Sequence, residues 1–160
     1  MIGQHAAIVF NLHQMAVPFL ACMALVASVY HLPPRVLPSI QAIEGGRVGL
    51  EHLNKDGSVD LGVMQINTLW VAPIARFTRL PEFNVRDRLL YDPCFNIAAA
   101  GLIMRTYLNE TKGDLMLAVG DYHSHTPVLN LEYRAKVLDA ARAMFVSPRQ
   151  PMPNAVRHGQ

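Results

Sequence analysis

The chain has 160 residues, of which 51% are hydrophobic and 16% are charged, and its formal net charge is +2. This length and composition predict one folded domain with a hydrophobic core and exclude a largely disordered chain. The small net charge, without any run of lysines and arginines, argues against nucleic-acid binding.

Residues 1–20 are mostly apolar and contain no lysine or arginine, so they lack the positive start of a typical secretory signal. Asn11, His13 and Gln14 interrupt the stretch and make it a poor membrane span. Two interpretations fit these residues. One is a degenerate export signal, with the mature protein beginning near Ala16, and the other is an ordinary N-terminal helix.

Helical spacing of apolar residues, with prolines and glycines as boundaries, predicts helix for most of the chain. The expected helices are residues 18–31, 35–44, 71–79, 82–90, 95–108, 114–122 and 129–145. Gly45-Gly46 ends the second of these helices, which places Glu44 at its C-terminus. The helix dipole disfavours a negative charge there and helps to keep the Glu44 carboxyl protonated. Asp92, just before Pro93, is expected to cap the helix that follows.

A β-hairpin is expected between the second and third helices. Asp56-Gly57 lies between extended residues in the segment 54–60, which is a strong turn signal. The sequence therefore predicts a mainly helical α+β fold with a small sheet over residues 16–146. Residues 147–160, rich in proline, are expected to form a flexible tail, and residues 1–15 an export signal or N-terminal extension.

Two carboxylates on either side of this hairpin turn suggest cleavage of a glycosidic bond. Glu44, shielded by apolar neighbours, would stay protonated near neutral pH and donate a proton to the leaving oxygen. Asp60, in a wetter setting, would stay ionised and stabilise a cationic sugar. A single Glu or Asp is more often an ordinary solvated residue, so the hypothesis depends on the occurrence of both around the same hairpin.

Polar side chains suited to a sugar follow the hairpin. Gln65 and Asn67 would share one face of an extended segment, with Met64 and Ile66 on the other face. Amides pair with hydroxyl and acetamido groups, and the indole of Trp70 can cover a pyranose ring.

The two cysteines, Cys22 and Cys94, fit either buried free thiols or one disulfide. A metal site would need more ligands at close spacing, so neither a metal nor a cofactor is expected.

Several blocks of this sequence together resemble the lysozyme superfamily. They are Tyr30-His-Leu-Pro-Pro-Arg-Val-Leu leading to Ala42-Ile-Glu44, Gly57-Ser-Val-Asp-Leu-Gly-Val-Met-Gln-Ile-Asn-Thr-Leu-Trp70, Asp92-Pro-Cys-Phe-Asn-Ile-Ala-Ala-Ala-Gly101 and Ala118-Val-Gly-Asp-Tyr-His-Ser124. Within the superfamily they are most similar to the small lytic transglycosylases associated with secretion, pilus and conjugation systems. The resemblance runs from about Cys22 to Val137 and implies a lysozyme-like fold.

The resemblance also implies roles for single residues. Glu44 corresponds to the general acid and base, and Tyr122 to a tyrosine that lies near it. Met64 and Gln65 match the Gly-Leu-Met-Gln block of the family, and Gln65 and Asn67 correspond to glycan-binding residues. We therefore expect Glu44 and Asp60 to act in catalysis. The residues expected to bind the substrate are Met64, Gln65, Asn67, Trp70 and Tyr122.

Two positions depart from the family pattern. Gly45 stands where the family has a serine after the acid, and His123 stands where it has an asparagine. By the same resemblance, Cys22 and Cys94 form a disulfide. A disulfide would imply an oxidising periplasm and would make residues 1–15 the remnant of an export signal.

The function implied by the resemblance is cleavage of the β-1,4 bond between N-acetylmuramic acid and N-acetylglucosamine in peptidoglycan strands, leaving 1,6-anhydro ends. The expected setting is local wall opening in the periplasm for an envelope-spanning secretion, pilus or conjugation apparatus. Because Asp60 is present, a muramidase that hydrolyses the same bond is an alternative function. A non-catalytic glycan-binding assembly factor and a membrane-anchored scaffold are alternatives of other classes.

Overall fold

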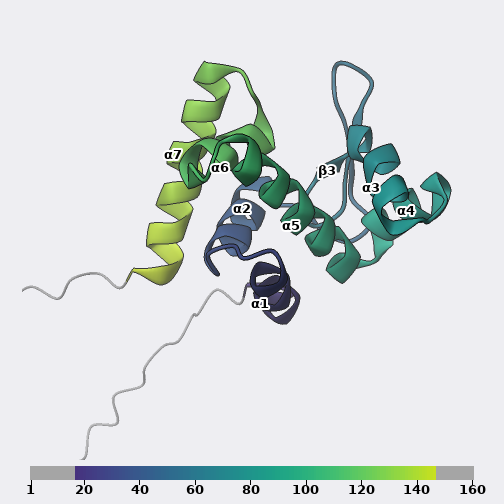
Figure 1. The fold of residues 1–160 in the computed structure, drawn as a ribbon, viewed down its shortest axis with the longest axis horizontal. Coiled ribbons are helices and arrows are strands. Elements are labelled where there is room, and N and C mark those ends of the chain that lie inside the picture. Colours follow the sequence, from purple (N-terminus) through teal and green to yellow (C-terminus); the bar gives the residue numbers. More distant parts are fainter. Residues whose placement is uncertain (1–16, 147–160) are drawn as a thin grey trace, which may run out of the picture.

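Seven α-helices and a small antiparallel sheet form the described part of the chain, residues 17–146 (Figure 1). In the computed structural model the helices are α1 (Leu20–Val29), α2 (Val36–Glu44), α3 (Val71–Thr78), α4 (Glu82–Tyr91), α5 (Pro93–Glu110), α6 (Leu115–His123) and α7 (Pro127–Phe145). The strands are β1 (Glu51–Leu53), β2 (Val59–Leu61) and β3 (Ile66–Asn67), followed by the 3-10 helix η1 (Thr68–Trp70). The prediction of a mainly helical α+β fold is confirmed.

The predicted helices all occur, with ends that differ by a few residues. Asp92 caps α5 as expected, because its side chain accepts a hydrogen bond of 3.0 Å from the backbone N–H of Phe95. Helix α7 begins at Pro127, two residues before the predicted start at Leu129. A proline in the first turn loses no helical hydrogen bond, so it opens this helix. The expected export segment, residues 1–15, and the expected tail, residues 147–160, lie outside the described residues.

Helix α5 crosses the middle of the molecule and packs against α1, α4 and α6, while α7 covers α2 and α6 (Figure 1). The buried side chains come from all of these helices and from the sheet. The largest of those that are fully buried are Met23, Leu37, Ile40, Leu61, Met64, Ile66, Ile74, Leu89, Ile97 and Met104. One continuous core therefore connects the helical body to the sheet.

The sheet has the order β1-β2-β3, and both pairs of strands are antiparallel. The predicted hairpin is confirmed: Leu53 pairs with Val59 across the turn that contains Asp56 and Gly57. The extended segment expected beyond it is shorter than predicted, because residues 62–65 form a turn.

Asn96 ties this turn to the helical body. Its completely buried side chain accepts a hydrogen bond of 2.8 Å from the backbone N–H of Met64. It also donates to the backbone oxygens of Leu61 at 2.8 Å and Leu89 at 2.7 Å. A polar group buried this deeply stabilises only when its hydrogen bonds are made. Asn96 therefore fixes the position of the segment between β2 and β3.

A disulfide joins Cys22 on α1 to Cys94 in the first turn of α5, across 72 residues of sequence, with the Cα atoms 5.5 Å apart. It fastens the N-terminal helix to the central one.

Within residues 17–146, no helix combines the length and the apolar character needed to cross a bilayer.

Candidate active site

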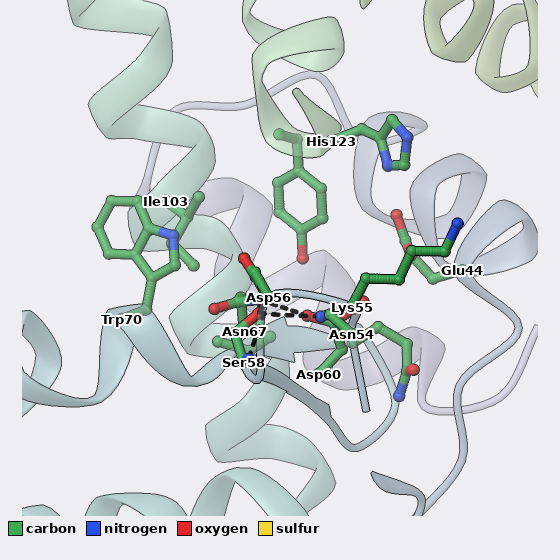
Figure 2. Close-up of a pocket in the computed structure, with 13 residues that line it drawn as sticks. Glu44, Asn54, Lys55, Asp56, Ser58, Asp60, Asn67, Trp70, Ile103 and His123 are labelled. Atoms are coloured by element: carbon green, nitrogen blue, oxygen red, sulfur yellow. Dashed lines mark hydrogen bonds between the residues drawn. The ribbon is translucent and has the colours of Figure 1, made fainter. Parts of the chain in front are cut away.

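A cleft of about 460 Å³ opens between the end of α2, the β-hairpin and the helices α5 and α6 (Figure 2). Its size suits part of an oligosaccharide or another small ligand. The lining residues are mostly polar: Glu44, Asn54, Lys55, Asp56, Ser58, Asp60, Gln65, Ile66, Asn67, Trp70, Ile103, Tyr122 and His123. The structure thus gathers Glu44, Asp60, Gln65, Asn67, Trp70 and Tyr122, six of the predicted site residues, around one space.

Glu44 is the last residue of α2, as predicted. Gly45 ends the helix in the left-handed region, with φ 61°, and its N–H donates to the Gln41 oxygen at 2.9 Å. At Gly46, a Cβ atom would collide with the backbone oxygens of Gly62 and Val63. Glycine there lets the segment after α2 lie directly against the turn after β2, which brings Glu44 beside the sheet.

The Glu44 carboxyl lies in a setting that favours its protonated form. Burial, as the main cause, and the negative charge of Asp60 raise its pKa from 4.5 to about 7. A hydrogen bond from the Tyr133 hydroxyl to Glu44 Oε1 acts in the opposite direction and lowers the pKa. The net result is a carboxyl that is partly protonated at neutral pH, as a general acid requires.

Tyr133 was not predicted as a site residue. It lies on α7, 89 residues after Glu44, and only 4% of its surface is exposed. Burial, followed by the charge of Glu44, raises the pKa of the Tyr133 phenol, so the hydroxyl remains a donor. The only signal in the sequence was a tyrosine on the buried face of a helix, whose hydroxyl needs a partner.

Asp60 lies across the cleft from Glu44, on β2. Its Oδ1 accepts a hydrogen bond of 2.8 Å from the Asn67 side-chain amide, which also donates to the Ser58 hydroxyl at 2.9 Å. The Oδ1 of Asn67 accepts from the backbone N–H of Leu69 at 2.9 Å. Asn67 therefore lines the cleft, but its polar atoms hold Asp60, Ser58 and η1 in place.

Gln65 and Tyr122 form the part of the cleft nearest the turn after β2. Gln65 adopts a left-handed backbone conformation, with φ 50°, and its side-chain amide donates to the Gly62 oxygen at 2.8 Å. The Tyr122 hydroxyl donates to the backbone oxygen of Met64 at 3.0 Å, and burial raises the pKa of this phenol well above its usual range. The Met64 side chain is fully buried in the core and does not line the cleft. Met64 therefore supports the site through its backbone.

Trp70 lies at the end of the cleft opposite Glu44 (Figure 2). Its indole ring and the ring of Tyr107 make an edge-to-face contact, with the ring centroids 5.9 Å apart. This contact orients the indole while leaving it on the wall of the cleft.

His123 lies at the other end, where its ring stacks on Tyr133 with centroids 4.8 Å apart and an interplanar angle of 6°. Partial burial and the nearby charge of Lys136 lower the pKa of His123, so its ring is mostly neutral at pH 7. The histidine thus extends the chain of contacts from Tyr133 to Glu44.

The site offers carboxyl groups, a histidine and amides. Within residues 17–146, no group of three or more His, Cys, Asp and Glu side chains is placed to hold a metal ion.

Comparison of the chain with protein-family models gave no match, and comparison with curated proteins gave none either.

Proposed function

We propose that this protein is a peptidoglycan lytic transglycosylase with a lysozyme-like fold. The observation that carries the proposal is the partly buried Glu44 carboxyl, whose pKa is raised to about 7 and which faces a polar cleft with a second carboxylate, Asp60. Two carboxyl groups in such different surroundings are the arrangement by which glycosidic bonds are broken at neutral pH; lysozyme is the standard case.

In the proposed reaction, Glu44 donates its proton to the oxygen that links N-acetylmuramic acid to the next sugar. The bond from that oxygen to C1 breaks, and the positive charge on the muramoyl ring is stabilised by its own acetamido group, by Asp60, or by both. Glu44, now a carboxylate, takes the proton of the C6 hydroxyl as its oxygen attacks C1. The product is a 1,6-anhydro sugar, and no water is consumed.

The C6 hydroxyl has an advantage over water because it belongs to the same molecule. A reacting group held in position has an effective concentration far above that of a solvent molecule. The remaining polar and aromatic groups of the cleft suit a glycan strand: Gln65 offers an amide, and Trp70 offers a flat apolar surface for a sugar ring.

The test is the chemistry of the new chain ends. Purified protein is incubated with isolated peptidoglycan sacculi, and the soluble products are analysed by mass spectrometry. Anhydro ends support transglycosylation, and they should be absent from a digest with the Glu44→Gln variant. If the wild type releases no soluble fragment, the proposal fails and a glycan-binding assembly factor becomes the better explanation.

A hydrolysing muramidase is the second candidate, and one observation favours it. Asp60 is held at the cleft by Asn67 and lies near enough to Glu44 for its charge to raise the pKa of that carboxyl. An ionised carboxylate in that position could assist attack by water, and the products would then carry reducing ends, 18 mass units heavier than anhydro ends (about the mass of one water).

The proposed cellular role is local opening of the wall for an envelope-spanning secretion, pilus or conjugation apparatus, with the enzyme in the periplasm. The disulfide between Cys22 and Cys94 supports an oxidising compartment. Titration of the unfolded, unreduced protein with a thiol reagent tests this point, because two reactive thiols in the exported protein would contradict it.

A further inference from the structure

A lysine at the tip of the β1–β2 hairpin, Lys55, lines the cleft. Lys55 is exposed, and among residues 17–146 it is the only lysine or arginine that lines the cleft. Figure 2 shows its side chain extending from the hairpin toward the side of the cleft where Glu44 and His123 lie. No ion pair to its ammonium group is found within the described part of the chain.

The turn that carries Lys55 is held by its own hydrogen bonds. The backbone N–H of Asn54 donates to the Ser58 oxygen at 2.8 Å, and that of Gly57 donates to the Asn54 oxygen at 3.0 Å. The neighbouring carboxylate, Asp56, accepts from the backbone N–H and the hydroxyl of Ser58, at 3.0 and 2.7 Å. Asp56 is therefore bonded within the turn, and the base of Lys55 is ordered while its ammonium group is left for a ligand.

The charges around the cleft restrict where an anion could bind. Asp56 and Asp60 lie along the hairpin wall and would repel a carboxylate placed against it. On the helical side of the cleft, Lys136 on α7 lies close enough to His123 for its positive charge to lower the pKa of that histidine. An anionic group of a bound ligand is therefore best placed near the Lys55 ammonium, at the open rim on the Glu44 side.

We propose that Lys55 binds a carboxylate of the substrate, so that the cleft prefers glycans with anionic substituents to neutral glycans of equal length. This inference rests on the proposed function and adds a substrate preference to it. The carboxylate has two possible sources in peptidoglycan: the lactyl group of a muramyl sugar without its peptide, or the peptide stem. An N-acetylglucosamine oligomer has neither.

Binding is measured in the Glu44→Gln background, so that no ligand is consumed. Isothermal titration uses three pentasaccharide ligands: a neutral N-acetylglucosamine oligomer, a peptide-free muramyl oligomer with lactyl carboxylates, and a muramyl oligomer that keeps its peptides. Lys55→Gln is added to this background and compared with a matched control, Lys112→Gln. Lys112 is exposed on the turn between α5 and α6 and does not line the cleft.

We expect Lys55→Gln to weaken binding of one or both carboxylate ligands by about fivefold, as for a solvent-exposed ion pair. The loss should shrink at high salt, and neutral-oligomer binding should not change. The ligand that loses affinity identifies the source of the carboxylate. Equal loss for the neutral oligomer, no loss for either carboxylate ligand, or the same loss from Lys112→Gln overturns this inference alone. If none of the three ligands binds, the proposed function is overturned with it.

Discussion

The two walls of the cleft each carry a partly buried carboxyl group, but the groups around the two carboxyls differ. On the helical wall, Glu44 is partly enclosed at the end of α2 and has one hydrogen-bond donor, Tyr133 from α7. On the hairpin wall, Asp60 lies in a network of polar side chains with Asn67 and Ser58. The difference lies in what the fold packs around each carboxyl: a helix end and the core around Glu44, and a short sheet with amides and hydroxyls around Asp60. This difference is the physical basis of the two roles that we propose.

The most severe test of this comparison is Glu44→Gln. The amide keeps the size and polarity of the side chain but has no proton to give, so we expect the rate of peptidoglycan cleavage to fall by roughly 10²–10⁴-fold. The measurement is the release of soluble fragments from sacculi. Glu132→Gln, an exposed change on α7, serves as the control and should keep the wild-type rate. Full activity in Glu44→Gln would remove this residue from the mechanism.

The same variant should also change how stability depends on pH. The pKa of Glu44 in the folded protein, about 7, lies above its ordinary value of 4.5. The fold therefore favours the protonated form. This contribution is fully present below pH 4.5 and is lost as the pH rises through 7. Relative to Glu44→Gln, the wild type should lose up to about 3 kcal/mol of unfolding free energy over this interval.

Urea denaturation of the two proteins at pH 4.5, 6 and 8 measures this difference. Because every other titrating group is shared, subtracting the two curves isolates Glu44. A constant difference across the three pH values would mean that the Glu44 carboxyl is solvated in the folded protein, and the distinction between the two walls would be lost.

Asp60→Asn tests the hairpin wall. The amide oxygen of the new residue can still accept the hydrogen bond from Asn67, so the network is kept and the charge is removed. If Asp60 stabilises a cationic sugar, the rate should fall by about 10- to 100-fold. The charge of Asp60 raises the pKa of Glu44, so the alkaline limb of the pH–rate profile should also move to lower pH. Asp87→Asn, an exposed change on α4, is the control.

Much of this arrangement could be predicted from the sequence, because its signals are local. The spacing of apolar residues predicted the helices, Asp56-Gly57 predicted the hairpin turn, and Gly45-Gly46 predicted that Glu44 lies at a helix end. Each of these features depends on residues within one or two turns of chain, where propensity and capping decide the structure.

The rest depends on contacts between distant segments. Gln65 was expected in a strand, but Asn96 on α5 binds the backbone N–H of Met64 and fixes a turn there. That hydrogen bond also explains why the Met64 side chain, expected at the substrate, lies in the core. Tyr133 reaches Glu44 only because α7 packs on α2. No local pattern specifies such a pairing.

Tyr133→Phe gives the smallest of the expected effects and the sharpest contrast with Asp60→Asn. The change removes only the hydroxyl that donates to Glu44, and a single hydrogen bond of this kind contributes about 0.5–1.5 kcal/mol net, so we expect a three- to tenfold loss of rate. That hydrogen bond lowers the pKa of Glu44, so its loss should move the alkaline limb of the pH–rate profile to higher pH. Tyr91→Phe, an exposed change outside the cleft, should leave the limb in place. Because Asp60→Asn moves the same limb to lower pH, opposite shifts would show that both walls act on one titrating group. Shifts in the same direction would mean that the limb belongs to another residue.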